Sequence, residues 1–145
     1  MQGTIGITIN RQENNGRYKY DIRVGEENFN GWAEVFNCIA GYYNPPKVYS
    51  SLKFYGVGKY DMVHLLYQFY PHGLDPFKTK NPYLRQGVAA RVLTRIIEDS
   101  IKDGAKALDL VAFEPEMKSF IAKHGFQPFR GFPGDRYYKL LSKVE

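Results

Sequence analysis

Alternation of apolar and polar residues marks the first 24 residues as a pair of strands. Residues 4–10 alternate in this way, and residues 18–24 do so again with aromatic and branched side chains on one face. Between them lies the run Asn14-Asn15-Gly16, a strong signal for a tight turn. The pattern therefore predicts an antiparallel hairpin at the start of the chain.

The pattern between residues 28 and 70 is less regular. Apolar residues at helical spacing predict a helix over 28–43, which Gly41 and the following prolines would end. The Tyr, Phe and Val content of 48–57 predicts a strand. Residues 62–70 are almost continuously apolar, which is typical of a central strand covered on both faces.

The clearest pattern is a helix that begins at Gly87 and ends near Gly104, with a continuous apolar stripe. A short apolar strand over 107–113 follows, and a strand, a helix and a second strand in this order predict parallel neighbours. A further helix begins near Pro115. Residues 126–129 and 136–141 predict a closing hairpin.

Composition narrows the class of protein. The chain has 145 residues, 43% of them hydrophobic and 24% charged, which predicts one globular domain over residues 1–145. Aromatic residues make up 16%, which favours a groove lined with rings. A single cysteine, Cys38, excludes an internal disulfide and a cysteine-based zinc site, and three scattered histidines predict no metal. Without a leader or membrane-length apolar run, we expect a cytoplasmic protein with no membrane partner.

The junction at Gly87 predicts an anion-binding turn. An irregular segment with several prolines ends there, and the helix begins with small side chains at Gly87, Ala89 and Ala90. The first turn of a helix presents unpaired N–H groups and the positive end of its dipole. A formal charge of +5 also favours an anionic partner: a polyphosphate, a nucleic acid or an acidic protein. We predict that this turn binds the pyrophosphate of a coenzyme.

The order of elements and two short motifs resemble the GCN5-related N-acetyltransferase (GNAT) superfamily over residues 62–141. The first motif is the family's acetyl-CoA loop, Gln/Arg-x-x-Gly-x-Gly/Ala, here Leu84-Arg85-Gln86-Gly87-Val88-Ala89 with Leu84 at the leading position. The second is the run 117–126, a helix that ends in Lys-His-Gly-Phe. The closing strand over 136–140 is also similar to that of the family. The first half of the chain fits less well, because the family commonly has two helices after its first strand.

The resemblance implies an α+β, three-layer αβα-like fold, in which a mixed, mostly antiparallel sheet splits at a cleft that binds coenzyme A. It implies acetyl-CoA as acyl donor and direct transfer to an amine, in a small molecule or a protein, and leaves a homodimer open. The residues it assigns to acetyl-CoA are Gln68, Phe69, Tyr70, Arg85, Gln86, Gly87, Val88, Ala89 and Ala90.

Acyl transfer to an amine requires a base near the thioester carbonyl. The candidates are His72, Glu114, Asp75 and His64, and His72 is favoured because it follows the central strand and titrates near neutral pH. His64 lies in a strand that we expect to be buried. Tyr138, on the last strand, is a further candidate to face the cleft.

Two alternatives remain open. The family often has a tyrosine that protonates the leaving thiolate where this chain has Ile121, so a catalytically inactive protein that binds coenzyme A or a partner is the first. The second is an acetyltransferase acting on aminoacyl-tRNA, or a protein that binds RNA, through a basic and aromatic surface. It ranks lower because the chain has no run rich in arginine and lysine.

Overall fold

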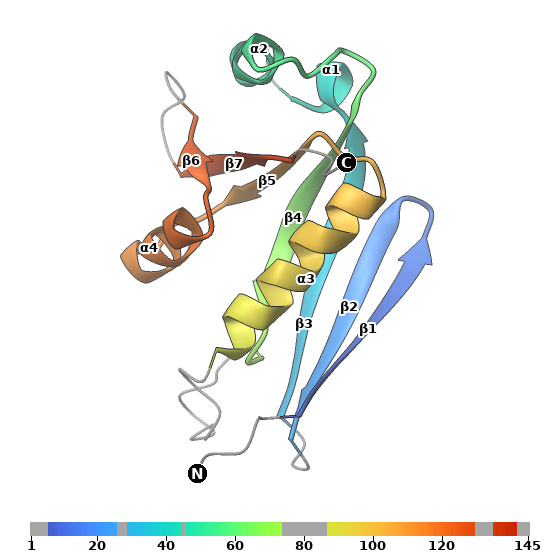
Figure 1. Cartoon of the computed structure of the whole chain (residues 1–145), viewed down its shortest axis with the longest axis vertical. Coiled ribbons are helices and arrows are strands. Elements are labelled where there is room, and N and C mark those ends of the chain that lie inside the picture. The colour runs from blue at the N-terminus through green and yellow to red at the C-terminus, as the bar shows by residue number, and fades with distance from the viewer. Residues whose placement is uncertain (1–5, 26–28, 45, 74–86, 130–134, 142–145) are drawn as a thin grey trace.

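A computed structural model describes residues 6–25, 29–44, 46–73, 87–129 and 135–141 (Figure 1). Seven strands form one sheet in the order β1-β2-β3-β4-β5-β7-β6. Strands β4 and β5 are parallel, and the other neighbours in this order are antiparallel. The elements are β1 (Ile7–Asn14), β2 (Arg17–Val24), β3 (Phe29–Ile39), α1 (Ala40–Tyr43), α2 (Pro46–Phe54), β4 (Met62–Tyr70), α3 (Val88–Lys102), β5 (Ala107–Val111), α4 (Pro115–Lys123), β6 (Gln127–Pro128) and β7 (Arg136–Leu140). The mixed, mostly antiparallel sheet flanked by helices is as predicted.

The hairpin at the start of the chain is confirmed. Strands β1 and β2 pair from Ile7 with Val24 to Asn14 with Arg17. The two turn residues, Asn15 and Gly16, have φ angles of 51° and 77°. Both lie in the left-handed region that a two-residue turn of this kind requires and that asparagine and glycine tolerate best.

Two predictions for the middle of the chain were wrong. The segment predicted as a helix is the long strand β3, in which alternate residues Ala33 and Val35 are buried and both neighbouring strands are paired. Pairing on two sides outweighs the helical spacing of its apolar residues. The segment predicted as a strand is helix α2. Its first residue is Pro46, which suits a first turn, and Val48 and Leu52 are buried one turn apart.

Helices lie on both faces of the sheet, because neighbouring residues of a strand point to opposite sides. Helix α3 crosses one face (Figure 1), where Val92 and Ile96 are fully buried with the inner side chains of β2 and β3. Helix α4 packs on the same side through Ile121. On the other face, α2 buries Val48 and Leu52 in a second cluster. The rest of that cluster is Ala40, Val57, Val63, Ala107, Phe129 and Tyr138, with Cys38, Tyr49 and Leu140 at its margin.

Buried and partly buried polar contacts hold the C-terminal half of α3 and its C-cap residue on the sheet. The Tyr20 hydroxyl donates a hydrogen bond to Asp99 Oδ2 over 2.9 Å, and Arg11 pairs with Asp103. His64, on β4, is buried as expected, and its Nδ1 lies 2.8 Å from Ser100 Oγ. These contacts set the direction of α3 and therefore where its first turn lies. No helix in the described ranges has the length and apolar character needed to cross a membrane.

Burial lowers the pKa of His64 to about 4, which makes stability depend on pH. Below the ordinary pKa of 6.5, the unfolded chain binds a proton at this site that the folded chain does not bind. Relative to the variant His64→Gln, the wild type should therefore lose about 3 kcal/mol of unfolding free energy as the pH falls from about 6.5 to about 4. Urea unfolding at a series of pH values measures this, with His124→Gln as the control. An equal pH slope in wild type and His64→Gln would contradict it.

Candidate functional site

The sheet divides between β4 and β5. These strands pair only from His64 to Leu66 with Leu108 to Leu110, whereas β4 continues to Tyr70 along β3. We call the space beyond Leu66 and Leu110 the fork. Among the described residues, none of β5 pairs with residues 67–70, so the backbone groups on that side of β4 are not used by the sheet. Such groups can bind a ligand that enters between the strands.

A β-bulge in β4 coincides with the start of the fork. Leu66 pairs with Val35 and Gln68 pairs with Glu34, so Tyr67 is an extra residue without a partner on β3. An extra residue bends its strand and increases the local twist. It also shifts the alternation of side chains, because Leu66 and Phe69 both pack toward the α3 face although they are three residues apart. The bulge therefore directs β4 away from β5.

The three predicted ligand-binding residues at the end of β4 lie along one arm of the fork. The Phe69 ring stacks on Phe120 of α4, with centroids 6.2 Å apart. Gln68 and Tyr70 lie on the opposite face, where Gln68 Oε1 accepts a hydrogen bond from Trp32 Nε1 and the Tyr70 ring lies 5.2 Å from the Trp32 ring. The side chains of Gln68 and Tyr70 contact Trp32, so any binding of acetyl-CoA by these two residues would use their backbone groups. That they bind acetyl-CoA stays a prediction.

Helix α3 begins at the same end of the sheet as the fork (Figure 1). It connects two parallel strands and so runs antiparallel to both, which places its N-terminus beside the end of β4. Gly87 is its N-cap residue, in the left-handed region at φ 81° and ψ 9°, with no side-chain hydrogen bond to the cap. The N–H of Arg91 is bonded to the Gly87 carbonyl, so the N–H groups of Val88, Ala89 and Ala90 precede the first intrahelical bond.

The N–H groups of a helix's first turn and the positive end of its dipole both favour an anion, so this turn suits an anion site. The exposed position of Gly87 leaves room for a ligand, since an added Cβ would meet no atom within 4 Å. The assignment of phosphate binding to this turn stays a prediction. Two residues predicted to take part, Arg85 and Gln86, lie outside the described residues.

The catalytic candidates lie in two places. His72 follows β4 and Glu114 follows β5, so both lie at the carboxyl ends of the two arms of the fork. Burial lowers the pKa of His72, which keeps its ring neutral at pH 7, and its Nδ1 has no hydrogen-bond partner among the described residues. Glu114 is exposed at the N-cap of α4. Tyr138 is buried beneath α2, on the other face of the sheet from α3.

Ile121 is fully buried in the core between α4 and the sheet. A side chain at this position packs against the core, so the fork takes no proton donor from it.

One buried acid at the start of the fork was missed by the sequence analysis. Asp109, on β5, immediately precedes the last paired residue and is fully buried. The Arg136 guanidinium lies 3.4 Å from Asp109 Oδ2 and also donates to Asn44 Oδ1 over 2.8 Å. Burial raises the pKa of Asp109 to about 7, against the effect of Arg136. Its Oδ1 has no hydrogen-bond partner in the described part of the chain. A charged residue within an otherwise apolar strand was the available signal.

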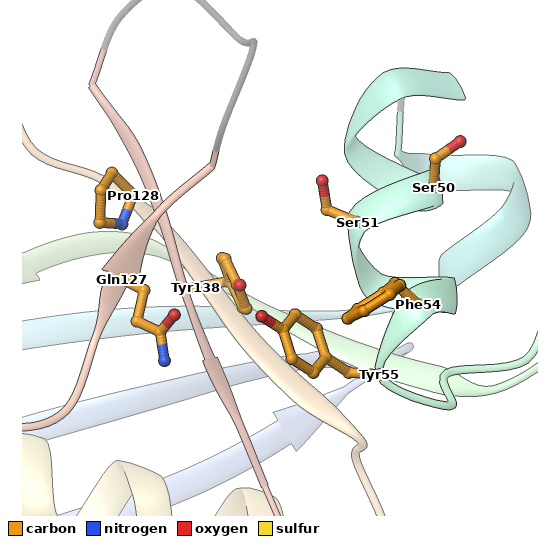
Figure 2. Close-up of a pocket in the computed structure, with 7 residues that line it drawn as sticks. All are labelled: Ser50, Ser51, Phe54, Tyr55, Gln127, Pro128 and Tyr138. Carbon is orange, nitrogen blue, oxygen red and sulfur yellow. The ribbon is translucent and has the colours of Figure 1, made fainter.

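A pocket of about 530 Å³ lies between α2 and the closing strands (Figure 2). Its lining is Ser50, Ser51, Phe54 and Tyr55 from α2 and the turn after it, Gln127 and Pro128 from β6, and Tyr138 from β7. It is the ring-lined cavity that the aromatic content favoured. Its position was not predicted, because α2 was expected to be a strand.

Among the described residues, no group of three or more His, Cys, Asp or Glu side chains is arranged to hold a metal ion. The prediction that the chain binds no metal stays a prediction.

Comparison with solved structures identifies the fold. AtaT complexed with acetyl-methionyl-tRNAfMet has a TM-score of 0.58 and 13% identity, over 94% of this chain and 95% of that chain. A mutant AtaT toxin bound to the C-terminus of the antitoxin AtaR and acetyl-CoA also has a TM-score of 0.58, with 11% identity over 96% and 94%. FeeM, an N-acyl amino acid synthase from uncultured soil microbes, has a TM-score of 0.55 and 13% identity, over 88% of this chain and 68% of that chain. No family model and no curated protein sequence matches the chain.

The raised pKa of Asp109 predicts a pH effect opposite in sign to that of His64. Between about pH 4 and about pH 7 the folded chain holds a proton at Asp109 that the unfolded chain releases, so this contribution to stability is lost as the pH rises. The unfolding free energy of the wild type should fall relative to that of Asp109→Asn over this window. Urea unfolding tests it, with Asp21→Asn as the control. A difference that is constant with pH would contradict the assignment.

Proposed function

The chain has the GNAT fold, and on that premise we propose that it is an acyl-CoA-dependent N-acyltransferase that passes an acetyl group directly to an amine. The observation that supports this is the fork together with the first turn of α3 at the same end of the sheet. The proposal takes residues 1–145 as one cytoplasmic domain that uses no metal, and leaves a homodimer open.

The donor substrate fits the fork by its chemistry. The pyrophosphate would lie at the first turn of α3, where the N–H groups of Val88, Ala89 and Ala90 face it. The pantetheine arm contains amides, and it would run along residues 67–70, where no described residue of β5 pairs with β4, so it could bond to the backbone there as a neighbouring strand would. Backbone N–H groups near the bulge would polarise the thioester carbonyl.

The transfer itself needs two proton movements. The lone pair of the amine attacks the carbonyl carbon, and a C–N bond forms as the C–S bond breaks, so the products are the amide and coenzyme A. A base takes the proton of the amine, and His72 suits this role because its ring is neutral at pH 7. Glu114 is a second candidate. The leaving thiolate takes a proton, for which the Tyr138 hydroxyl is the candidate, because the isoleucine at position 121 has no proton to donate.

The structural neighbours support an amine as the acceptor class. AtaT is described in complex with acetyl-methionyl-tRNAfMet, and FeeM is described as an N-acyl amino acid synthase. Both N-acetyl-methionine and an N-acyl amino acid carry an amide at an amino group. By analogy of fold, we extend that acceptor class to this chain.

A second candidate function is supported by Ile121, an isoleucine where the GNAT superfamily often has a tyrosine that protonates the thiolate. If no other group protonates the thiolate, the chain would bind coenzyme A without transferring its acyl group. Both hypotheses, the inactive protein and the enzyme, predict binding of coenzyme A, and only the enzyme predicts release of coenzyme A from acetyl-CoA in the presence of an amine.

The first test is binding of coenzyme A by the variant Gly87→Glu. A carboxylate at the first turn of α3 would repel the pyrophosphate, and we expect the affinity to fall about 10-fold or more, equal to about 1.4 kcal/mol. Gly104→Glu is a matched control. Gly104 also has a positive φ, 89° against 81°, and a Cβ added there would also meet nothing within 4 Å.

Both variants carry the same charge and the same backbone strain, so only Gly87→Glu should weaken binding in calorimetry. Equal affinity of the two variants for coenzyme A would show that the pyrophosphate does not bind at this turn. A wild type that binds neither coenzyme A nor acetyl-CoA would refute the proposed function.

The second test is turnover by His72→Gln. A base contributes about 10² to 10⁴ in rate, so amine-dependent release of coenzyme A should fall by this range with unchanged affinity for coenzyme A. In the wild type the rate should decrease as the pH falls below 6.5, because the pKa of His72 is lowered. This decrease in rate at low pH should be absent from His72→Gln. The variant Glu114→Gln is measured in the same way for comparison.

A lower rate with an unchanged pH profile would assign His72 a structural role. A wild type that binds acetyl-CoA but releases no coenzyme A with any amine would favour the hypothesis of an inactive protein.

A further inference from the structure

The pocket between α2 and the closing strands has ring faces on both of its walls. Tyr55 faces Tyr138 across it, with ring centroids 6.3 Å apart and a tilt of 41° (Figure 2). Phe54 stands edge-on to Tyr55 with centroids 5.1 Å apart. Although both are large apolar side chains, Phe54 is 83% exposed and Tyr55 is 52% exposed. A planar apolar group placed against the exposed faces of Phe54 and Tyr55 would cover ring surface that water now contacts.

The polar part of the pocket is neutral. The hydroxyls of Ser50 and Ser51 lie on α2 and the amide of Gln127 lies on the opposite wall (Figure 2). None of the described residues that line the pocket carries a charge. A charged group would lose hydration here and find no oppositely charged side chain among these described residues, whereas a neutral ring needs no such partner. The volume of about 530 Å³ is within the range of sites for small molecules, about 300–1,000 Å³.

The pocket lies next to the fork. Tyr138 is opposite Asp109 in the ladder of β5 and β7, and Asp109 is one residue before Leu110, where the fork begins. Neighbouring strands are about 5 Å apart and successive residues about 3.3 Å, so the ring wall is within about 10 Å of the fork. The pocket is on the α2 face of the sheet, and the first turn of α3 belongs to the other face.

A donor bound at α3 and an acceptor bound in the pocket would therefore meet at the fork from opposite faces, as direct transfer requires. The pocket thus offers an aromatic position for the rest of the acceptor while its amine lies at the fork.

We infer that this pocket binds the acceptor, and that the acceptor is an amine that carries a neutral aromatic ring about 5–10 Å from its nitrogen. The inference rests on the proposed function and adds the class of substrate to it. The covalent step is unchanged: the amine nitrogen forms the amide bond, the C–S bond breaks, and coenzyme A leaves.

The experiment measures kcat/KM for release of coenzyme A from acetyl-CoA with three amines. These are 2-phenylethylamine, which has the ring, propylamine, which lacks it, and spermidine, which replaces it with charge. We expect 2-phenylethylamine to exceed both others by about 10-fold or more, since one ring is desolvated on binding. Tyr55→Ala should remove this preference and leave the affinity for coenzyme A unchanged. Tyr60→Ala is the matched control, because Tyr60 is 71% exposed and does not line the pocket.

A second variant changes charge without changing shape. Gln127→Glu places a carboxylate on the wall opposite α2, and it should raise kcat/KM for spermidine relative to 2-phenylethylamine by about 10-fold. Binding of N-acetyl-2-phenylethylamine, the product, is measured by calorimetry in the presence of coenzyme A. It should be lost in Tyr55→Ala, and this readout does not depend on turnover.

Three results would overturn the inference and leave the proposed function standing. They are equal kcat/KM for the ring and alkyl amines, no binding of the product by a wild type that binds coenzyme A, and a Tyr55→Ala variant that alters the preference among acetyl-, butyryl- and octanoyl-CoA instead of among amines. The last would assign the pocket to the acyl chain of the donor. Failure of the wild type to bind coenzyme A would refute the proposed function itself.

Discussion

The extra residue in β4 is the constraint on which the site depends. Strand β3 holds β4 on one side along its whole length, so the insertion of Tyr67 cannot be absorbed there without bending β4. The bend ends the pairing with β5 after Leu66. Without it, a parallel partner would use the backbone groups of residues 67–70. The fork is thus a place where the sheet leaves polar backbone groups unpaired among the described residues, and a ligand rich in amides can pair with them.

The packing of α3 directs a second binding element to the same place. Its apolar stripe fixes the helix on the sheet, and the bonds from Tyr20 and Arg11 to its C-terminal half fix its direction. Because α3 joins two parallel strands, its first turn must lie at the carboxyl end of β4, where the fork is. Gly87 begins the helix in a left-handed conformation that needs no side chain at that position.

The position of the helical pair sets the other face of the site. Proteins of the GNAT superfamily, which the sequence resembles, commonly have two helices after the first strand, whereas here α1 and α2 connect β3 to β4. Helix α2 still reaches the closing strands, since Val48 and Leu52 share a cluster with Phe129 and Tyr138. Phe54 and Tyr55, at the end of α2 and just after it, form a wall of the pocket. The two faces of the sheet thereby carry separate binding features that meet at the fork.

Local pattern was enough to predict the elements whose signals do not depend on neighbours: the first hairpin, β4, α3, β5, α4 and the closing hairpin. The start of α3 at Gly87 followed from the same pattern, and so did the position of Gln68, Phe69 and Tyr70 at the end of β4. Strand β3 and helix α2 were predicted wrongly, because their apolar spacing fits either structure and pairing with β2 and β4 decides between them. The burial of Asp109 beside Arg136, the bulge at Tyr67 and the ring-lined pocket join residues far apart in the chain. Only the tertiary structure could determine these, because each arises from which strands become neighbours and not from the sequence of any one of them.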